Sequence, residues 1–238
     1  MKFCTFKTFS EMSEAAAEAV AEVLREKPGC VLGLATGSSP VGLYDALARM
    51  HAGSGLSFSE CTTVNLDEYL GLPGTHPQSY RRFMEEHLFS RVDVQRERTF
   101  VPDGTAADPA AECAAYDARL EALGGTDLQV LGIGPDGHIG FNEPDDVFTK
   151  ATHVVDLAES TIRANSRFFA SESEVPRRAI TMGMGGIMGA KKILLVAAGP
   201  GKRKVLDAAF SGPVTPRLPA SLLQLHRDVA VLWSEESR

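Results

Sequence analysis

The stretch "DLQVLGIGPDGHIGFNEP", residues 127–144, decides how the chain folds around its most polar turn. A short apolar run, typical of a buried strand, leads into three glycines with the G-x-G-x-x-G spacing of a dinucleotide-binding turn. Asp156 even supplies an acidic residue about 20 positions further on. Such a turn must open a helix, however, and Gly140 and Pro144 interrupt any helical pattern. We therefore predict a strand that ends in a ligand-facing loop, without a dinucleotide.

Around this stretch the chain alternates short apolar runs with amphipathic ones. The pattern predicts further strands within residues 30–35, 61–66, 177–185, 191–199 and 227–234. It predicts helices within residues 10–29, 41–51, 76–89, 108–123, 158–169 and 201–210. Continuous apolar strands between helices are typical of a mostly parallel sheet covered on both faces. We expect one three-layer, doubly wound, Rossmann-like α/β domain over residues 1–238.

Composition excludes several classes of protein. A chain of 238 residues can bury a sizeable core without a disulfide or metal staple. Its net charge of −7 argues against general binding of nucleic acids or anionic membranes. None of the four cysteines has the C-x-x-C or C-x-x-H spacing of a zinc or redox site. No signal peptide and no membrane-spanning apolar run is apparent, so we expect a cytoplasmic protein.

Polar or glycine-rich residues follow four of the predicted strands. These are "ATGSSP" after Leu34, "DEY" after Leu66, "PDGHIGFNEP" after Gly134 and "GPGK" after Ala198. In open parallel sheets, ligands bind outside the carboxyl ends of the strands. We therefore expect the four segments to meet in one site.

The loop within residues 131–144 concentrates titratable groups. Asp136, His138 and Glu143 lie within eight positions of one another. Asp-Gly is a common turn, so these residues could be only turn residues. Two carboxylates beside an imidazole would instead orient it and raise its pKa, which suits proton transfer near neutral pH. No G-x-S-x-G elbow supports a serine hydrolase, and no second histidine at helical spacing supports a metal site.

A second group of residues suggests an anion. The loop of Thr36, Gly37, Ser38 and Ser39 runs into a predicted helix N-terminus, where backbone N–H groups and the helix dipole favour negative charge. Ordinary helix capping by Ser38 or Ser39 is the alternative. Three cations add to the suggestion of a phosphorylated small molecule, namely Arg163, Arg167 and Lys202.

The segment "NLDEYLG", residues 65–71, adds a carboxylate to the same edge of the sheet. Asp67 and Glu68 follow a strand directly, and either could act as a general base at the mouth of the site. A surface turn is the alternative, and periodicity does not choose between the two acids.

Taken in order, "LATGSSP", "VNLDEYLGL" with "HPQSY", "LGIGPDGHIGFNEP", "ANSRFF" and "ASLLQLH" resemble glucosamine-6-phosphate deaminases over nearly the whole chain. The resemblance implies conversion of glucosamine 6-phosphate and water to fructose 6-phosphate and ammonia, in amino sugar catabolism, without metal or organic cofactor. The ring opens, the amino aldose isomerises through an enolamine, and the ketimine is hydrolysed.

The resemblance also implies roles for individual residues. Asp67 resembles the base that moves a proton between C2 and C1, and His138 resembles the acid–base of ring opening. Asp136 and Glu143 would flank that histidine. Substrate phosphate would be held by Thr36, Gly37, Ser38, Ser39, Arg167 and Lys202, while Arg163 is left as a surface residue. A mobile lid is implied around residues 155–175.

One part of the chain departs from the longer, hexameric members of the family. Those bind an allosteric activator, N-acetylglucosamine 6-phosphate, through basic residues just after the FNEP motif and a longer C-terminal extension. Here the segment reads "DDVFTKATHVV", residues 145–155, and the sequence ends at "LWSEESR". We expect an enzyme without allosteric activation, as a monomer or small homo-oligomer.

Two other functions share features of this pattern. A 6-phosphogluconolactonase would need a phosphosugar site but no carboxylate to move a C2 proton, so the "NLDEY" acid argues against it. A phosphosugar-sensing regulator would need a DNA-binding segment, and the chain has no basic recognition helix.

Overall fold

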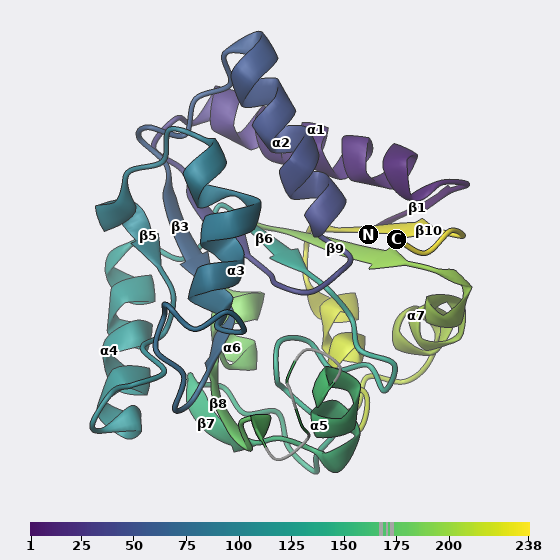
Figure 1. Cartoon of the computed structure of the whole chain (residues 1–238). Helices are drawn as coiled ribbons and strands as arrows, with labels where there is room; N and C mark the ends of the chain where they lie inside the picture. Colours follow the sequence, from purple (N-terminus) through teal and green to yellow (C-terminus); the bar gives the residue numbers. More distant parts are fainter. Residues whose placement is uncertain (167–168, 170, 172–173) are drawn as a thin grey trace.

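The computed structural model describes residues 1–166, 169, 171 and 174–238 (Figure 1). Its main sheet has seven strands, and every neighbouring pair is parallel. In spatial order they are β1 (Lys2–Phe6), β10 (Val229–Ser234), β9 (Lys192–Ala198), β6 (Leu128–Leu131), β2 (Val31–Leu34), β3 (Thr62–Asn65) and β5 (Thr99–Phe100). The expected doubly wound α/β fold is therefore confirmed.

Helices lie on both sides of this sheet. Those on one side are α1 (Phe9–Glu26), α2 (Val41–Ser54) and α3 (Tyr80–His87), which lie in the connections after β1, β2 and β3. The connections back from β5, β6 and β9 carry α4 (Pro109–Ala122), α6 (Met184–Met188) and α7 (Arg203–Ser211). Short 3₁₀ helices complete the connections, namely η1 (Phe89–Arg91), η2 (Arg96–Arg98), η4 (Pro200–Lys202) and η5 (Pro219–Leu225). In Figure 1, α1 and α2 lie above the sheet while α7 lies below it.

The direction of winding reverses between two neighbouring strands. From β2 the chain proceeds to β3 and β5 on one side, whereas from β6 it proceeds to β9 and β10 on the other. The loops that leave β2 and β6 therefore diverge to opposite faces and open a crevice at the carboxyl ends of these strands. This switch point is the place where such a fold most often binds a ligand.

A second, three-stranded antiparallel sheet lies beside the first (Figure 1, lower part). It consists of β4 (Asp67–Tyr69), β8 (Arg178–Thr181) and β7 (His153–Asp156). The sequence predicted the strand at β8 but not its place in a separate sheet, because pairing with a three-residue strand leaves no periodic signal. The helix α5 (Glu159–Ser166) packs against this sheet through buried Ile162.

Helix ends follow local chemistry. Thr8 and Glu11 form the expected capping box at α1. At α4, Asp108 is the N-cap and directly precedes Pro109, and its side chain accepts hydrogen bonds from two backbone N–H groups of the first turn. The helix predicted from residue 76 begins only at Tyr80, because Ser79 is its N-cap and accepts a bond from the backbone N–H of Arg82. Within the described residues, no helix has the length and apolar character needed to cross a membrane.

Candidate active site

The four polar strand ends meet around one pocket of about 310 Å³. Residues from each of the loops after β2, β3, β6 and β9 line it. The pocket lies at the switch point described above, so the topology of the sheet itself places these loops together. Of the predicted site residues, the lining includes Thr36, Gly37, Ser38, Ser39, Asp67, Asp136, His138 and Lys202.

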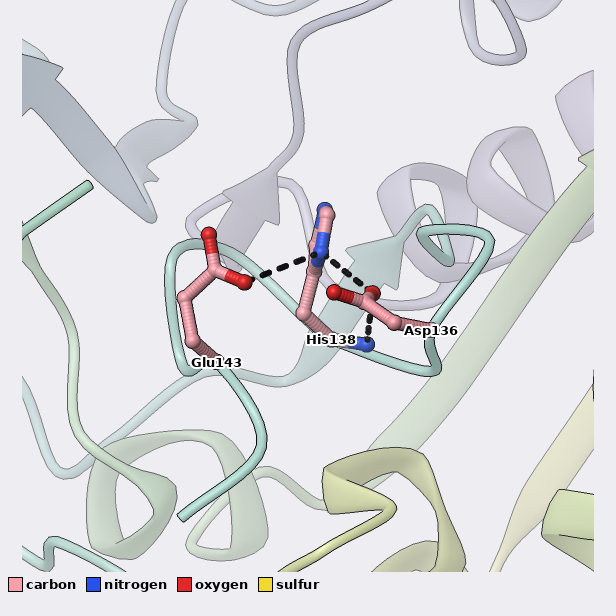
Figure 2. Close-up of side chains that lie close together, drawn as sticks. All are labelled: Asp136, His138 and Glu143. Atoms are coloured by element: carbon pink, nitrogen blue, oxygen red, sulfur yellow. Dashed lines mark hydrogen bonds and ion pairs between the residues drawn. The ribbon is translucent and has the colours of Figure 1, made fainter. Parts of the chain in front are cut away.

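The loop after β6 holds His138 between two carboxylates (Figure 2). The imidazole Nδ1 lies 2.7 Å from Asp136 Oδ1 and 3.7 Å from Glu143 Oε2. The first contact departs from the direction of a normal ring hydrogen bond, so Nδ1 faces both acids without being fully engaged by either. The opposite end of the ring, Nε2, points away from both carboxylates in Figure 2.

Glycines make this arrangement possible. A Cβ on Gly134 would lie 2.2 Å from His138 Cε1, so the imidazole packs flat against the bare backbone of that residue. Gly137 has φ +87°, a left-handed conformation that glycine adopts without strain. The G-x-G-x-x-G spacing therefore accommodates an imidazole in a tight turn, not a pyrophosphate.

The two acids differ in their electrostatics. Burial raises the pKa of Asp136, but its contacts with His138 outweigh burial and hold the pKa at about 2. Burial raises the pKa of Glu143, opposed by a hydrogen bond from the Thr161 hydroxyl and by the nearby imidazole. Asp136 is thus fixed as an anion, while Glu143 is the more readily protonated partner of His138.

The same three side chains have the composition of a metal site. Asp136, His138 and Glu143 each present one ligand atom, and these atoms lie within 4.8 Å of one another. A carboxylate–imidazole set of this kind suits a divalent transition metal as well as proton transfer. The two possibilities differ in their response to a chelator.

The structure distinguishes the role of Asp67 from that of Glu68 by their contacts, which the strand pattern could not do. The Glu68 carboxylate accepts bonds from the backbone N–H groups of Tyr69, Tyr80 and Arg81 at 2.9, 2.9 and 3.0 Å. Two of these groups belong to the first turn of α3, so Glu68 stabilises that helix N-terminus. Asp67 instead lines the pocket.

The surroundings of Asp67 raise the pKa of its carboxyl group, so its carboxylate accepts a proton readily. Its side chain is buried, and no hydrogen bond from the described residues offsets the loss of water. Burial, followed by the neighbouring charge of Glu68, raises the pKa of Asp67 to about 8. A carboxylate of this basicity is well matched to abstraction of a carbon-bound proton near neutral pH.

The loop after β2 remains available to a ligand. The N-cap of α2 is Pro40, and no side chain caps the helix, so Ser38 and Ser39 do not serve as caps. Gly37 has φ +97°, which turns the backbone sharply at the pocket. N–H groups and hydroxyls at the start of a fourteen-residue helix form a suitable cradle for a phosphate.

The cations considered for the phosphate site lie in different places. Lys202 lines the pocket, where its ammonium donates to the carbonyl oxygen of Ile133 at 2.7 Å, and burial lowers its pKa. Arg167 lies outside the described residues, as does part of the lid expected over 155–175. Arg163 is exposed, in keeping with its assignment to the surface.

Two polar side chains of the described pocket lining were not singled out from the sequence. Tyr80, at the start of α3, lines the pocket, and its hydroxyl donates to the hydroxyl of Tyr69 at 3.4 Å. Thr161, on α5, lines the pocket and donates to Glu143 Oε1 at 2.7 Å. Both come from helices, where periodicity reports only which face is buried and not what the buried hydroxyl contacts.

Known proteins resemble this chain throughout its length. Residues 7–233 match the family described as "Glucosamine-6-phosphate isomerases/6-phosphogluconolactonase". Glucosamine-6-phosphate deaminase of Clostridium perfringens is 52% identical over 237 residues, which cover 100% of this chain and 98% of the relative. The deaminase of Lachnoclostridium phytofermentans is 53% identical over 232 residues, covering 98% of each chain.

Solved structures agree with this relationship. A structure of a monomeric glucosamine-6-phosphate deaminase superimposes with a TM-score of 0.97 at 46% identity, covering 99% of this chain and 98% of that one. The 6-phosphogluconolactonase of Trypanosoma brucei has a TM-score of 0.76 at 21% identity, covering 99% of this chain and 96% of that one, and shares the fold alone. By sequence and by fold, the chain belongs to the glucosamine-6-phosphate isomerase/6-phosphogluconolactonase family.

Proposed function

We propose that this chain is a glucosamine-6-phosphate deaminase, which converts glucosamine 6-phosphate and water to fructose 6-phosphate and ammonia. The observation that carries the proposal is the pair of proton-transfer groups lining one pocket. They are Asp67, which has no hydrogen-bond donor among the described residues, and His138, which lies between two acids. Full-length relatives named as this deaminase support the substrate.

Ring opening is assigned to His138. Its Nε2, which points away from both acids, would accept the proton of the anomeric hydroxyl and return one to the ring oxygen as the C1–O5 bond breaks. Asp136 and Glu143 stabilise the imidazolium that exists between these two transfers. The fixed negative charge of Asp136 orients the ring through Nδ1, which leaves Nε2 for the sugar.

Isomerisation is assigned to Asp67. The carboxylate would remove the C2 proton of the open-chain amino aldehyde, whose electrons form the C1–C2 double bond of an enolamine. Return of a proton to C1 gives a ketimine at C2. Water then adds to C2, ammonia leaves, and the ketone of fructose 6-phosphate remains.

The phosphate is assigned to the loop of residues 36–39, at the N-terminus of α2. Lys202 supplies a positive charge from the described part of the pocket, and Arg167 is proposed as a second cation. Anchoring the phosphate away from the reacting carbons would fix C1 and C2 against Asp67, which is how remote binding energy accelerates chemistry.

The finer features of the proposal concern assembly and location. We propose one catalytic domain that acts as a monomer or small homo-oligomer in the cytoplasm, with a lid around residues 155–175 that closes over the sugar. The close structural relative described as monomeric supports the simplest of these states. Neither a metal nor an organic cofactor is required by the steps above.

The proposal is tested by a coupled assay that follows ammonia and fructose 6-phosphate from glucosamine 6-phosphate, with and without EDTA. Equimolar release of both products, unaffected by the chelator, is expected. Folded protein without turnover would refute the deaminase. Turnover abolished by EDTA would assign Asp136, His138 and Glu143 to a metal instead of to a proton relay.

A further inference from the structure

Thr161 connects the helix α5 to the acid pair around His138. Its hydroxyl donates to Glu143 Oε1 at 2.7 Å, and its side chain is buried at the edge of the pocket. Neither the proton relay nor the phosphate cradle proposed above uses this residue. A buried hydrogen bond between a neighbouring helix and a reacting acid therefore needs an explanation of its own.

The two oxygens of Glu143 are engaged differently. Oε1 accepts the Thr161 bond, whereas Oε2 is buried without any hydrogen-bond partner among the described residues and lies 3.7 Å from His138 Nδ1. Fixing one oxygen removes the rotation that would turn the other away from the imidazole. The charged groups that face Glu143 are Asp136 and His138, both from its own loop, and α5 adds only this hydroxyl.

The position of Thr161 is itself set by packing. The adjacent Ile162 is buried in a cluster with Tyr69, Phe141 and Leu157, which joins α5 to the second sheet. With Ile162 held in that cluster, the hydroxyl of the preceding residue is directed to Glu143. The contact is thus a consequence of how α5 docks and not of a surface encounter.

We propose that Thr161 is a positioning residue for the ring-opening step, which holds Glu143 so that its second oxygen stays against His138. The inference rests on the proposed deaminase function, since ring opening is the step that uses this histidine. A donor to the carboxylate also favours its ionised form. Loss of the hydroxyl should therefore raise the pKa of Glu143 above the already raised value.

The test compares Thr161→Val, which keeps the shape but removes the donor, with Thr161→Ser, which restores it. The valine variant should lose about tenfold in kcat with little change in KM, as expected for a hydrogen bond to a charged group. Below the pH range in which Asp67 titrates, its kcat should fall more steeply with decreasing pH than that of the wild type, because a less acidic Glu143 is protonated earlier on acidification. The serine variant should recover most of the activity and the original profile.

Thr152→Val is the matched control. Thr152 is also buried and also donates to a carboxylate, Asp117 Oδ1 at 2.5 Å, but it does not line the pocket. That variant should leave kcat and the pH profile in place, even where it loses thermal stability to the same extent as Thr161→Val. Unchanged kcat and profile in folded Thr161→Val, or no recovery in Thr161→Ser, would overturn the inference.

A second measurement separates this inference from the proposed function. Titration of the Glu143 carboxyl by ¹³C NMR, assigned with Glu143→Gln, needs no substrate. The carboxyl should titrate at higher pH in Thr161→Val than in the wild type and Thr161→Ser. If the wild type does not deaminate glucosamine 6-phosphate, the function fails while this titration still tests the positioning. An identical titration in all three proteins would refute the positioning.

Discussion

The carboxylate of Asp67 is basic because it is buried and has no hydrogen-bond donor among the described residues. Glu68, the next residue, uses both carboxylate oxygens on backbone N–H groups, whereas Asp67 is buried without a donor from the described residues. Successive residues of a strand point to opposite faces, so the two acids enter different surroundings. The sequence could place a carboxylate at the strand end but not choose between the two, because the choice depends on the N-terminus of α3.

The first prediction concerns the pH dependence of proton abstraction. Since the pKa of Asp67 is raised to about 8, the fraction of ionised base should grow as pH rises through that value. Exchange of the C2 hydrogen with deuterated solvent should therefore increase from pH 6 to about pH 9. A flat exchange rate over this range would contradict the assigned base.

The second prediction concerns Asp67→Asn. Loss of a general base should slow C2 exchange by about a thousandfold while phosphosugar binding persists. The variant should also gain stability relative to the wild type as pH rises. An acid with a raised folded pKa loses folding free energy as pH climbs from its unfolded pKa of about 4 towards 8, and asparagine does not. Full C2 exchange in the variant would remove Asp67 from its role.

The third prediction concerns Gly140. It has φ +60°, and an added Cβ would lie 2.9 Å from Thr181 Oγ1 and 3.3 Å from Asp67 Oδ2. Gly140→Ala should cost about 1 kcal/mol of stability and disturb Asp67, lowering C2 exchange about tenfold.

Gly55→Ala is the control for Gly140→Ala. Gly55 has a similar φ of +69° at the end of α2, but a Cβ there meets nothing within 4 Å. It should show the same loss of stability in chemical denaturation without any loss of exchange. Equal activity in the two variants would show that Gly140 matters only for the backbone.

At the scale of elements, caps and apolar strands were predictable, whereas the second sheet was not. The capping box at Thr8 and the cap at Asp108 depend on residues within a few positions, so local chemistry sufficed. The pairing of β4 with β8 joins Asp67 to Thr181 across more than a hundred residues. That pairing positions Asp67 against the loop after β6, through a tertiary contact that no local pattern encodes.

The fourth prediction concerns Asp127, which joins three elements at the amino end of the central strands, opposite the pocket. Its carboxylate binds the ammonium groups of Lys27 and Lys191 at 2.7 Å and accepts the backbone N–H of Val31 at 2.8 Å. Burial opposes ionisation, but these contacts hold the pKa of Asp127 at about 2. Asp127→Asn should therefore lower the free energy of unfolding by about 2 kcal/mol at pH 7.

The pH dependence provides the check on Asp127. A lowered folded pKa gives stability that is complete above the unfolded pKa of about 4 and is lost as pH falls towards 2. The difference between wild type and Asp127→Asn in urea denaturation should vanish over that range. Asp207→Asn, at an exposed pair with Arg203, should change stability by less than about 1 kcal/mol. A constant difference at all pH values would contradict this assignment.

In the whole molecule, a second pocket of about 240 Å³ is lined in part by the loop that carries Glu143, and Glu143 itself belongs to this lining. Its described lining includes the acids Asp145 and Asp156 and the imidazole of His153, but no lysine or arginine. Such a lining disfavours a phosphate. The expectation that the enzyme lacks a phosphosugar activator, drawn from the segment of residues 145–155, stays a prediction.

The fifth prediction follows from that pocket. Addition of N-acetylglucosamine 6-phosphate should not lower the glucosamine 6-phosphate concentration at half-saturation, and the saturation curve should stay hyperbolic. Steady-state kinetics over a range of effector concentrations provides the check. A leftward shift of the curve would show that an activating site exists despite the acidic lining.

The chain shares its fold with 6-phosphogluconolactonases, so the two activities must be distinguished by the reaction and not by the architecture. The most direct measurement follows glucosamine 6-phosphate and, separately, 6-phosphogluconolactone by NMR in deuterated water with the wild-type protein. We expect fructose 6-phosphate that carries solvent deuterium at C1, one ammonium for each molecule formed, and no acceleration of lactone hydrolysis. Accelerated lactone hydrolysis without ammonium release would contradict it.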